Sequence, residues 1–400
     1  MAAKRKPDTE ADKVGTGAAR GKASADGDGG TVPATRPEAP DIASPKPAPA
    51  PRAVKTVPKH RTAPRSGTRA TAAPPFNLLV LGQRGRIGFE ALALAASLRR
   101  ACPDFPGRLI VAEPQPEAAW EGVDTLLPAE LRAALEACGA QVVPFTATRF
   151  GHAYPYGNKI EALSVLPEGQ PFLFLDSDTL VTGDLARMPF DFARPSASMR
   201  RSGTWPEPPL YGPGYTAIWR SLYDRFGLDF EASLDPAQPD EHWERYLYFN
   251  AGWFFGADPA EFGRRFADWA QAVLDEPGDA LACQRLDVHL DQIVLPLVIH
   301  SLGGGRPGAE LAGMDGAVTC HYRYLSLLYA RESDAAVAAL EALADEKPVR
   351  RVLRDWGAFH RLVLRKAGAR RIRPMFDREA PPPEPAIRRA LKQAGYWSRD

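Results

Sequence analysis

The sequence predicts an α/β protein whose sheet is mainly parallel and is covered by helices on both faces. Between residues 76 and 176, short apolar runs alternate with segments of helical composition, a pattern typical of strands joined by crossover helices. The last of these runs, Phe-Leu-Phe-Leu, is the most apolar and leads directly into Asp176-Ser-Asp178. Because functional sites in such sheets lie at the carboxyl ends of the strands, we expect chemistry at this strand end.

The predicted sheet starts at residues 76–82, where the apolar run FNLLVLG ends in glycine, as a buried strand does. Residues 88–100 have helical composition, and Pro103 prevents that helix from continuing. Residues 108–113, RLIVAE, form the second predicted strand. Together these segments predict two parallel strands connected by a helix.

The alternation continues further along the chain. A helix predicted over residues 128–138 ends before Gly139, which suits the left-handed position after a helix. The third predicted strand, 141–145, contains a proline that weakens it. A helix over 158–166 then precedes the fourth strand, 171–176, so the Asp-x-Asp segment lies at the end of the fourth strand.

Charge and cysteine content exclude several classes of protein. The 400 residues include 50 basic and 49 acidic residues, a net charge of +1, which argues against a strongly basic nucleic-acid-binding protein. We therefore expect no nucleic-acid partner. The four cysteines lie far apart without a C-x-x-C pair, which excludes a disulfide scaffold and the common zinc ribbons and is typical of a reducing compartment.

The hydropathy pattern predicts where the protein is located. No run approaches the roughly 18 apolar residues of a membrane-spanning helix. No apolar segment follows the basic N-terminus, so we expect no secretory signal. The prediction is a cytoplasmic protein.

The charge is divided unevenly among three regions. Residues 1–75 contain 14 basic and 7 acidic residues, 12 of the 39 prolines, and no Phe, Tyr, Trp or Leu, which predicts a disordered, basic, Pro/Ala-rich tail. Residues 76–346 carry a net charge of −16 and form the predicted globular domain. Residues 347–400 carry a net charge of +10, which predicts a basic, partly amphipathic helical extension.

Within that extension, apolar residues recur at helical spacing among arginines and lysines. They are Val352, Leu353, Trp356, Phe359, Leu362 and Val363. One interpretation is that this apolar face packs on the body of the protein. The other is that it attaches the protein peripherally to an anionic membrane surface.

The two carboxylates at the end of the fourth strand predict a metal site. Alternate side chains of an extended chain point the same way, so Asp176 and Asp178 would lie about 6–7 Å apart on one side. Hard oxygen ligands of this kind suit Mg²⁺ or Mn²⁺, which take further ligands from substrate phosphates. The alternative is a solvated turn in which the carboxylates cap backbone N–H groups.

The segment FLFLDSDTLVTGDL resembles the Asp-x-Asp segment of glycosyltransferases with the Rossmann-like GT-A fold, especially the glycogenin-like family eight. Tyr248-Phe-Asn250-Ala-Gly252-Trp is similar to that family's F-N-[SA]-G segment, which lines the donor-sugar pocket. Leu290-Asp291-Gln292 is similar to its D-Q segment. The resemblance covers roughly residues 76–330. It implies a metal-dependent hexosyltransferase that uses a nucleotide-sugar donor, a UDP-sugar, and an acceptor that the sequence does not identify.

The resemblance also implies roles for individual residues, with 76–346 as the catalytic domain. Mn²⁺ or Mg²⁺ would bind to the two aspartates and to the histidine of Cys320-His-Tyr322. A basic residue before the fourth strand would contact the diphosphate. Apart from the resemblance, the glycines and arginines of the first strand–helix turn predict a second basic contact to the diphosphate. The asparagine and aspartate of the later motifs would be the catalytic residues, which hydrogen-bond the donor sugar, and the glycine of F-N-A-G would contact the donor. The metal ligands would be Asp176, Asp178 and His321. The residues at the diphosphate would be Arg86 and Lys159, and those at the donor sugar Asn250, Gly252 and Asp291.

Some assignments stay open at this point. His289 and His300 are alternatives to His321 as the nitrogen ligand, and Gln292 either contacts the sugar or faces the core. Aromatic residues between the two main motifs either stack on an acceptor sugar or pack in the core. They are Trp205, Tyr211, Tyr215, Trp219 and Trp243.

Two other functions fit parts of the pattern. An Asp-x-Asp after an apolar strand also resembles the haloacid-dehalogenase phosphatases, in which Asp176 would be the nucleophile. Those enzymes usually carry the motif on their first strand, whereas here three strands precede it. The other alternative is a non-catalytic binding protein on the same fold.

Overall fold

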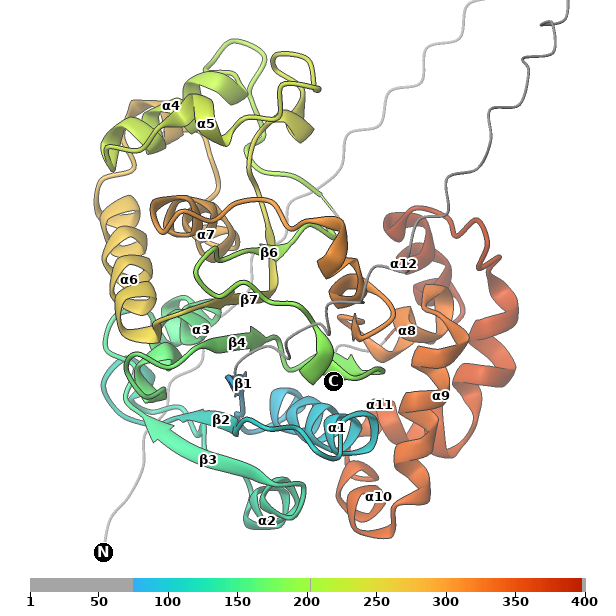
Figure 1. The fold of residues 1–400 in the computed structure, drawn as a ribbon. Helices are drawn as coiled ribbons and strands as arrows, with labels where there is room; N and C mark the ends of the chain where they lie inside the picture. The colour runs from blue at the N-terminus through green and yellow to red at the C-terminus, as the bar shows by residue number, and fades with distance from the viewer. Residues whose placement is uncertain (1–74, 202, 398–400) are drawn as a thin grey trace, which may run out of the picture. The chain divides into compact units, whose positions relative to one another are not determined.

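The computed structural model describes residues 75–201 and 203–397, which lie in one compact unit. Its central sheet has six strands in the order β3-β2-β1-β4-β7-β6 (Figure 1). The strands β3, β2, β1 and β4 are parallel, and β7 runs antiparallel to both β4 and β6. The bounds are β1 (Asn77–Leu81), β2 (Leu109–Pro114), β3 (Ala140–Phe145), β4 (Phe172–Leu175), β6 (Ala197–Ser198) and β7 (Asn250–Gly256). The expected α/β class with a mainly parallel sheet is confirmed.

The predicted strands and helices occur where the sequence placed them, within a few residues. The helix expected over 158–166 is α3 (Asn158–Glu161) followed by a 3₁₀ turn, Ala162–Val165. Proline is tolerated in β3 because this strand lies at the edge of the sheet, where one side of the backbone has no neighbouring strand.

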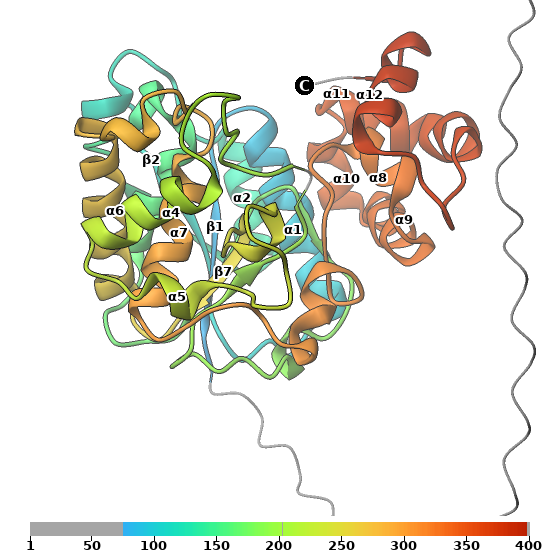
Figure 2. The same cartoon turned by 90° about the horizontal axis from the view of Figure 1, so that it is seen from above.

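Helices cover both faces of the sheet (Figures 1 and 2). Successive side chains of a strand alternate between faces, so Leu78 and Val80 join one hydrophobic core while Leu79 joins the other. On the first face lie α1 (Arg86–Ala101) and α2 (Ala129–Ala137). On the second lie α3, α6 (Pro259–Asp275) and α7 (Leu290–Ser301), with α4 (Tyr215–Arg225) and α5 (Phe230–Ser233) beyond them.

A small second sheet is formed by β5 (Thr179–Val181) and β8 (Thr319–His321). The two strands are antiparallel, and Thr179 is paired with His321. This pairing places the end of β8 next to the turn that follows β4.

The C-terminal region is a group of helices beside α1 (Figure 2). It comprises α8 (Leu325–Arg331), α9 (Asp334–Ala342), α10 (Lys347–Leu353), α11 (Gly357–Phe359) and α12 (Glu384–Gln393). The single amphipathic helix expected here is divided between α10 and α11, with a π-helical turn over His360–Leu364. α10 packs on α1 and α2, so the chain continues across residue 346 without a break in packing.

All six apolar residues of that expected helix are buried in the core that contains α1. The interpretation that this face packs on the body is therefore confirmed. These apolar side chains are not available to contact a membrane, because they are already covered by protein. Arg350, Arg351 and Arg354 stay exposed, and their contact with an anionic membrane remains a prediction.

Two other expectations concern the N-terminal tail and membrane-spanning helices. The predicted tail, 1–75, lies almost wholly outside the described residues. Within residues 75–201 and 203–397, no helix is both long enough and apolar enough to cross a membrane.

Candidate functional site

A cavity of about 780 Å³ opens at the carboxyl ends of β1 and β4. Its walls come from seven places in the chain: the turn before α1, the start of α3, the turn after β4, the segment after β6, the strand β7, the start of α7 and the end of β8. A mainly parallel sheet brings these strand ends to one edge, which is why distant motifs meet there. Most of the site residues that the sequence predicted line this cavity.

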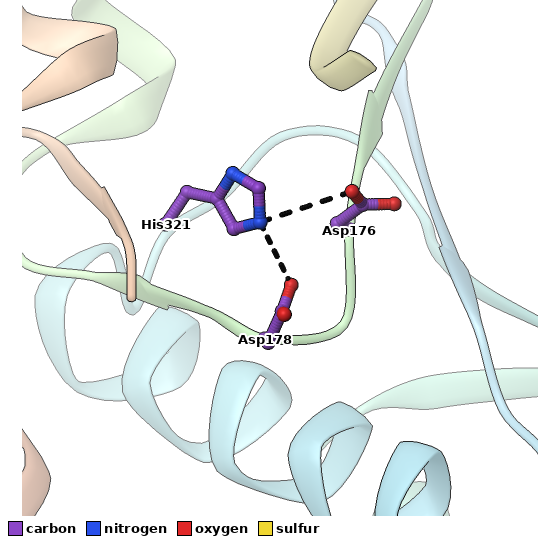
Figure 3. Close-up of side chains that lie close together, drawn as sticks. All are labelled: Asp176, Asp178 and His321. Atoms are coloured by element: carbon purple, nitrogen blue, oxygen red, sulfur yellow. Dashed lines mark ion pairs between the residues drawn. The ribbon is translucent and has the colours of Figure 1, made fainter. Parts of the chain in front are cut away.

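Asp176, Asp178 and His321 converge in the cavity wall (Figure 3). Nε2 of His321 lies 3.0 Å from an oxygen of Asp178 and 3.8 Å from an oxygen of Asp176. One ligand atom from each of the three residues lies within 4.8 Å of the others. Two carboxylates and an imidazole form a donor set that suits Mn²⁺ or Mg²⁺ better than a soft metal.

The two aspartates approach each other through a turn rather than through the extended chain that the sequence suggested. Residues Ser177 and Asp178 form this turn between β4 and β5. The backbone on both sides is held, because Asp176 N donates to Gly252 O at 2.9 Å and Tyr322 N donates to Asp178 O at 3.0 Å. Strands β7 and β8 thus position the carboxylates.

The absence of a side chain at Gly252 makes room for the histidine. A Cβ at this position would overlap the imidazole of His321 and come close to the Asn250 carboxamide. Oδ1 of Asn250 accepts a hydrogen bond from Gly252 N at 2.9 Å, and its Nδ2 donates to Arg200 O at 2.9 Å. The F-N-A-G segment therefore shapes the space beside His321, and its asparagine is fixed at both ends.

Lys159 lies in the cavity wall between two carboxylates. Its Nζ is 2.9 Å from Asp176 Oδ1, 3.2 Å from Asp291 Oδ2 and 3.3 Å from Ala251 O. Burial lowers the pKa of this ammonium group, but the two carboxylates outweigh that effect and hold the pKa above its ordinary value. The side chain is therefore a fixed positive charge within the site.

Asp291, in the first turn of α7, is almost completely buried. Its Oδ1 accepts a hydrogen bond of 2.7 Å from the Tyr154 hydroxyl, while its backbone N donates to the same hydroxyl at 3.0 Å. Burial and the neighbouring Asp291 raise the pKa of Tyr154 well above its ordinary value, so the phenol stays a donor. Sequence reasoning missed Tyr154, because nothing local connects it to Asp291.

The two carboxylates of the Asp176–Asp178–His321 cluster differ in their electrostatic surroundings. Burial raises the pKa of Asp176, and the opposing effects of Lys159 and His321 do not fully compensate. Burial also acts on Asp178, but His321 and Arg86 outweigh it and hold the pKa of this carboxyl below its ordinary value.

Arg86 reaches the same cavity from the start of α1. Its Nη2 lies 4.0 Å from Asp178, its Nη1 donates to Arg323 O at 3.1 Å, and its guanidinium lies over the Tyr324 ring at 4.7 Å. Glu90, one turn further along α1, is 3.4 Å from Arg86 Nε. Burial and the nearby Asp178 raise the pKa of Glu90 well above its ordinary value.

The three candidate histidines differ in where they lie relative to the two aspartates. His300, in the last turn of α7, packs against the ring of Tyr223 at 5.4 Å. His289 lines the cavity just before α7, but it is not part of the cluster. Of these candidates, only His321 lies with the two aspartates.

The aromatic residues expected at an acceptor site do not line the cavity. Trp205 and Trp219 are buried and pack edge to face at 5.2 Å, and Tyr215 stacks on Tyr246. Core packing is therefore the better interpretation for these three residues. The tyrosines that do line the cavity are Tyr156, Tyr248 and Tyr324.

Gln292 also lines the cavity rather than facing the core. Its Oε1 accepts a hydrogen bond of 2.9 Å from the Tyr248 hydroxyl. Gln292 belongs to the D-Q segment and Tyr248 begins the segment similar to F-N-[SA]-G, so the sequence motifs already contained both residues. Arg201 and Arg323 line the cavity without any such signal.

The fold places acidic residues at the carboxyl end of its fourth strand, as the resemblance to GT-A glycosyltransferases predicts. Residues 78–303 match a family model described as the Rhodobacterales glycosyltransferase domain. Because that match spans more than half of the chain, the chain belongs to this family. The predicted enzyme class is thereby confirmed over the phosphatase and binding-protein interpretations, while the narrower glycogenin-like type stays an expectation.

Comparison with solved structures gives weaker similarities. The galactosyltransferase LgtC, in complex with donor and acceptor sugar analogs, is 16% identical, with a TM-score of 0.35; 60% of this chain and 79% of that chain are covered. The bifunctional glycosyltransferase WbbM is 14% identical, with a TM-score of 0.32, over 60% of this chain and 40% of that chain. Mouse xyloside xylosyltransferase 1 is 12% identical, with a TM-score of 0.33, over 58% and 84%. No curated protein sequence matches the chain.

Proposed function

We propose that this glycosyltransferase transfers a sugar from a UDP-sugar to an acceptor in a reaction that depends on Mn²⁺ or Mg²⁺. The observation that carries the proposal is the convergence of Asp176, Asp178 and His321 in the wall of a cavity large enough for a nucleotide sugar. The absence of a side chain at Gly252 is a second observation in favour of the proposal, because a Cβ there would overlap the imidazole of His321. A mixed oxygen and nitrogen donor set favours Mn²⁺ over Ca²⁺.

The three residues of this cluster would hold the ion, and the ion would stabilise the charge of the leaving diphosphate. Arg86 adds a positive charge on the same side of the cavity, because its guanidinium lies next to Asp178. Lys159 adds a second charge from below. The region 76–346 has a net charge of −16, so these local cations are needed to attract a polyanionic donor.

The sugar of the donor would lie between β7 and the start of α7. Asn250 and Asp291 are held rigidly by hydrogen bonds to Arg200 O, to Tyr154 and to Lys159. Rigid polar groups of this kind select a sugar by the orientation of its hydroxyls, because a mismatched hydroxyl leaves a buried partner unpaired. Gln292 extends this polar wall on the side of Tyr248.

Calorimetric titration with UDP, with and without Mn²⁺, tests the proposal. We expect binding that depends on the metal and that Asp178→Asn weakens at least about tenfold, since a neutral amide is a poorer ligand for a hard cation. Asp268→Asn, on the exposed surface of α6, is the matched control and should bind like the parent protein. Undiminished metal-dependent binding by Asp178→Asn would contradict the assignment.

A further inference from the structure

A second cavity of about 290 Å³ adjoins the first. Arg201, Asn250, His321 and Arg323 line both cavities. The aspartates of the metal cluster, Arg86 and Lys159 do not line the second one. It therefore extends from the proposed sugar side of the site, away from the residues assigned to the diphosphate.

Arginines dominate the wall of this second cavity, which we call the arginine cavity. Arg200, Arg201, Arg323 and Arg331 line it, together with two acidic residues, Asp315 and Glu384. Oδ1 of Asp315 is occupied by hydrogen bonds from Ser198 Oγ and Trp253 Nε1. The cavity thus presents more positive than negative charge.

Three of the four arginines have a carboxylate partner. Arg200 is paired with Glu332 at 2.8 Å. Arg323 and Arg331 share Glu384, at 3.2 and 2.6 Å. These pairs fix the wall of the cavity and neutralise most of its charge locally.

Arg201 is the exception among these four arginines. No carboxylate of the described residues lies within ion-pair distance of its guanidinium, and its Nη1 is buried without a hydrogen-bond partner. The guanidinium lies over the ring of Trp243 at 4.6 Å and near that of Tyr248 at 5.8 Å. Burial lowers its pKa from the ordinary value, yet an arginine keeps its charge under such conditions.

An unpaired guanidinium that is partly buried is costly, and an oxyanion partner would remove that cost. The guanidinium lies over the rings of Trp243 and Tyr248, and a guanidinium group can bind a carboxylate or phosphate in a bidentate way. No other cation on this wall is free to do so within the described chain, because the other arginines are already paired.

We infer that the arginine cavity binds a carboxylate or phosphate group of a sugar substrate, with Arg201 as the main contact. The inference rests on the proposed function, since it places this group on a sugar held beside Asn250 and His321. The anionic group could belong to the donor sugar or to the acceptor. The two sources share the same chemistry and differ in which ligand carries the charge.

Glucose, glucuronic acid and glucose 6-phosphate test the acceptor source, because they differ only at C6. They are titrated into the full-length protein in the presence of UDP and Mn²⁺, and again without them. We expect at least one of the two anionic sugars to bind at least about tenfold more tightly than glucose, the effect of a charge-assisted bidentate contact. UDP-glucuronic acid and UDP-glucose, compared with Mn²⁺ present, test the donor source in the same way.

Arg201→Gln should abolish whichever preference is found, and Arg201→Lys should restore part of it. Metal-dependent binding of UDP by Arg201→Gln should be unchanged, which shows that the variant is folded and separates this inference from the proposed function. Arg187→Gln, whose side chain is 87% exposed, is the matched control and should keep the preference.

Equal binding of neutral and anionic ligands in both arms would overturn the inference, as would a preference for the anion that survives in Arg201→Gln. Failure of UDP to bind would contradict the proposed function instead. The titrations without UDP would then still decide whether Arg201 binds an anionic sugar.

Discussion

Nζ of Lys159 lies 2.9 Å from Oδ1 of Asp176, a carboxylate that also lies within reach of His321. The ammonium group also donates to Oδ2 of Asp176 at 3.2 Å, and Oδ2 is the oxygen that lies 3.8 Å from His321 Nε2. The same ammonium group is 3.2 Å from Asp291, so it connects the metal cluster with the proposed sugar wall. This relationship has consequences that can be measured without knowing the substrates.

Lys159→Met should lower the free energy of unfolding by about 3–5 kcal/mol, because it leaves two buried carboxylates without their shared partner. Mn²⁺ should recover more stability in this variant than in the parent protein, since Asp176 no longer has a competing cation. Urea unfolding with and without Mn²⁺ measures both effects. Lys366→Met, at a half-exposed lysine, is the control and should change stability by less than about 0.5 kcal/mol. Equal stabilities of Lys159→Met and the parent protein would refute the assignment.

Gly252→Ala should interfere with His321, because the added methyl group would overlap the imidazole. We expect metal-dependent UDP binding to weaken at least about tenfold, with a loss of stability of about 1–3 kcal/mol from overpacking. Calorimetry and thermal unfolding measure the two effects separately. Gly357→Ala, where the added Cβ would meet open space, should leave both nearly unchanged. Normal UDP affinity in Gly252→Ala would show that the position of His321 does not matter for binding.

His321→Ala and His300→Gln distinguish the candidate nitrogen ligands. His321→Ala should reduce the affinity for Mn²⁺ and with it the binding of UDP, since it removes one of the three converging groups. His300→Gln should retain both, because His300 packs against Tyr223 away from the cluster. Titration of Mn²⁺ followed by electron paramagnetic resonance reports the metal affinity directly. Loss of Mn²⁺ affinity in His300→Gln but not in His321→Ala would contradict this assignment and place the metal site at His300.

Glu384 predicts how stability depends on pH. Burial acts to raise its pKa, but Arg331, Arg388 and Arg323 outweigh this and hold the pKa below its ordinary value. A carboxyl of this kind stabilises the fold fully above its unfolded-state pKa, and the contribution is lost as the pH falls below about 4 through the lowered value.

Glu384→Gln should therefore cost about 1–3 kcal/mol of unfolding free energy at pH 7. The difference from the parent protein should shrink at pH 3. Urea unfolding at the two pH values measures it. Glu231→Gln, at an exposed ion pair with Arg220, is the control and should show little difference at either pH. A difference for Glu384→Gln that is the same at both pH values would contradict this account.

The sequence alone determined the order of strands and helices from β1 to β4, because apolar runs, glycines and prolines act locally. It also determined that Asp176 and Asp178 follow the central strand β4 as close neighbours in the chain. The α/β class and the glycosyltransferase class could both be predicted from these features. The predicted functional site lies where parallel strands place it.

Only the tertiary structure decided which distant groups meet. The pairing of β5 with β8 brings His321, rather than His289 or His300, next to the two aspartates. The packing of α10 and α11 on the body decided between the two interpretations that the sequence left open for this apolar face. No local pattern records that Tyr154 holds Asp291 or that Arg201 lacks a carboxylate partner among the described residues. The physical reason is that propensity acts between neighbours along the chain, whereas ligand sets, ion pairs and burial depend on residues that the fold brings together.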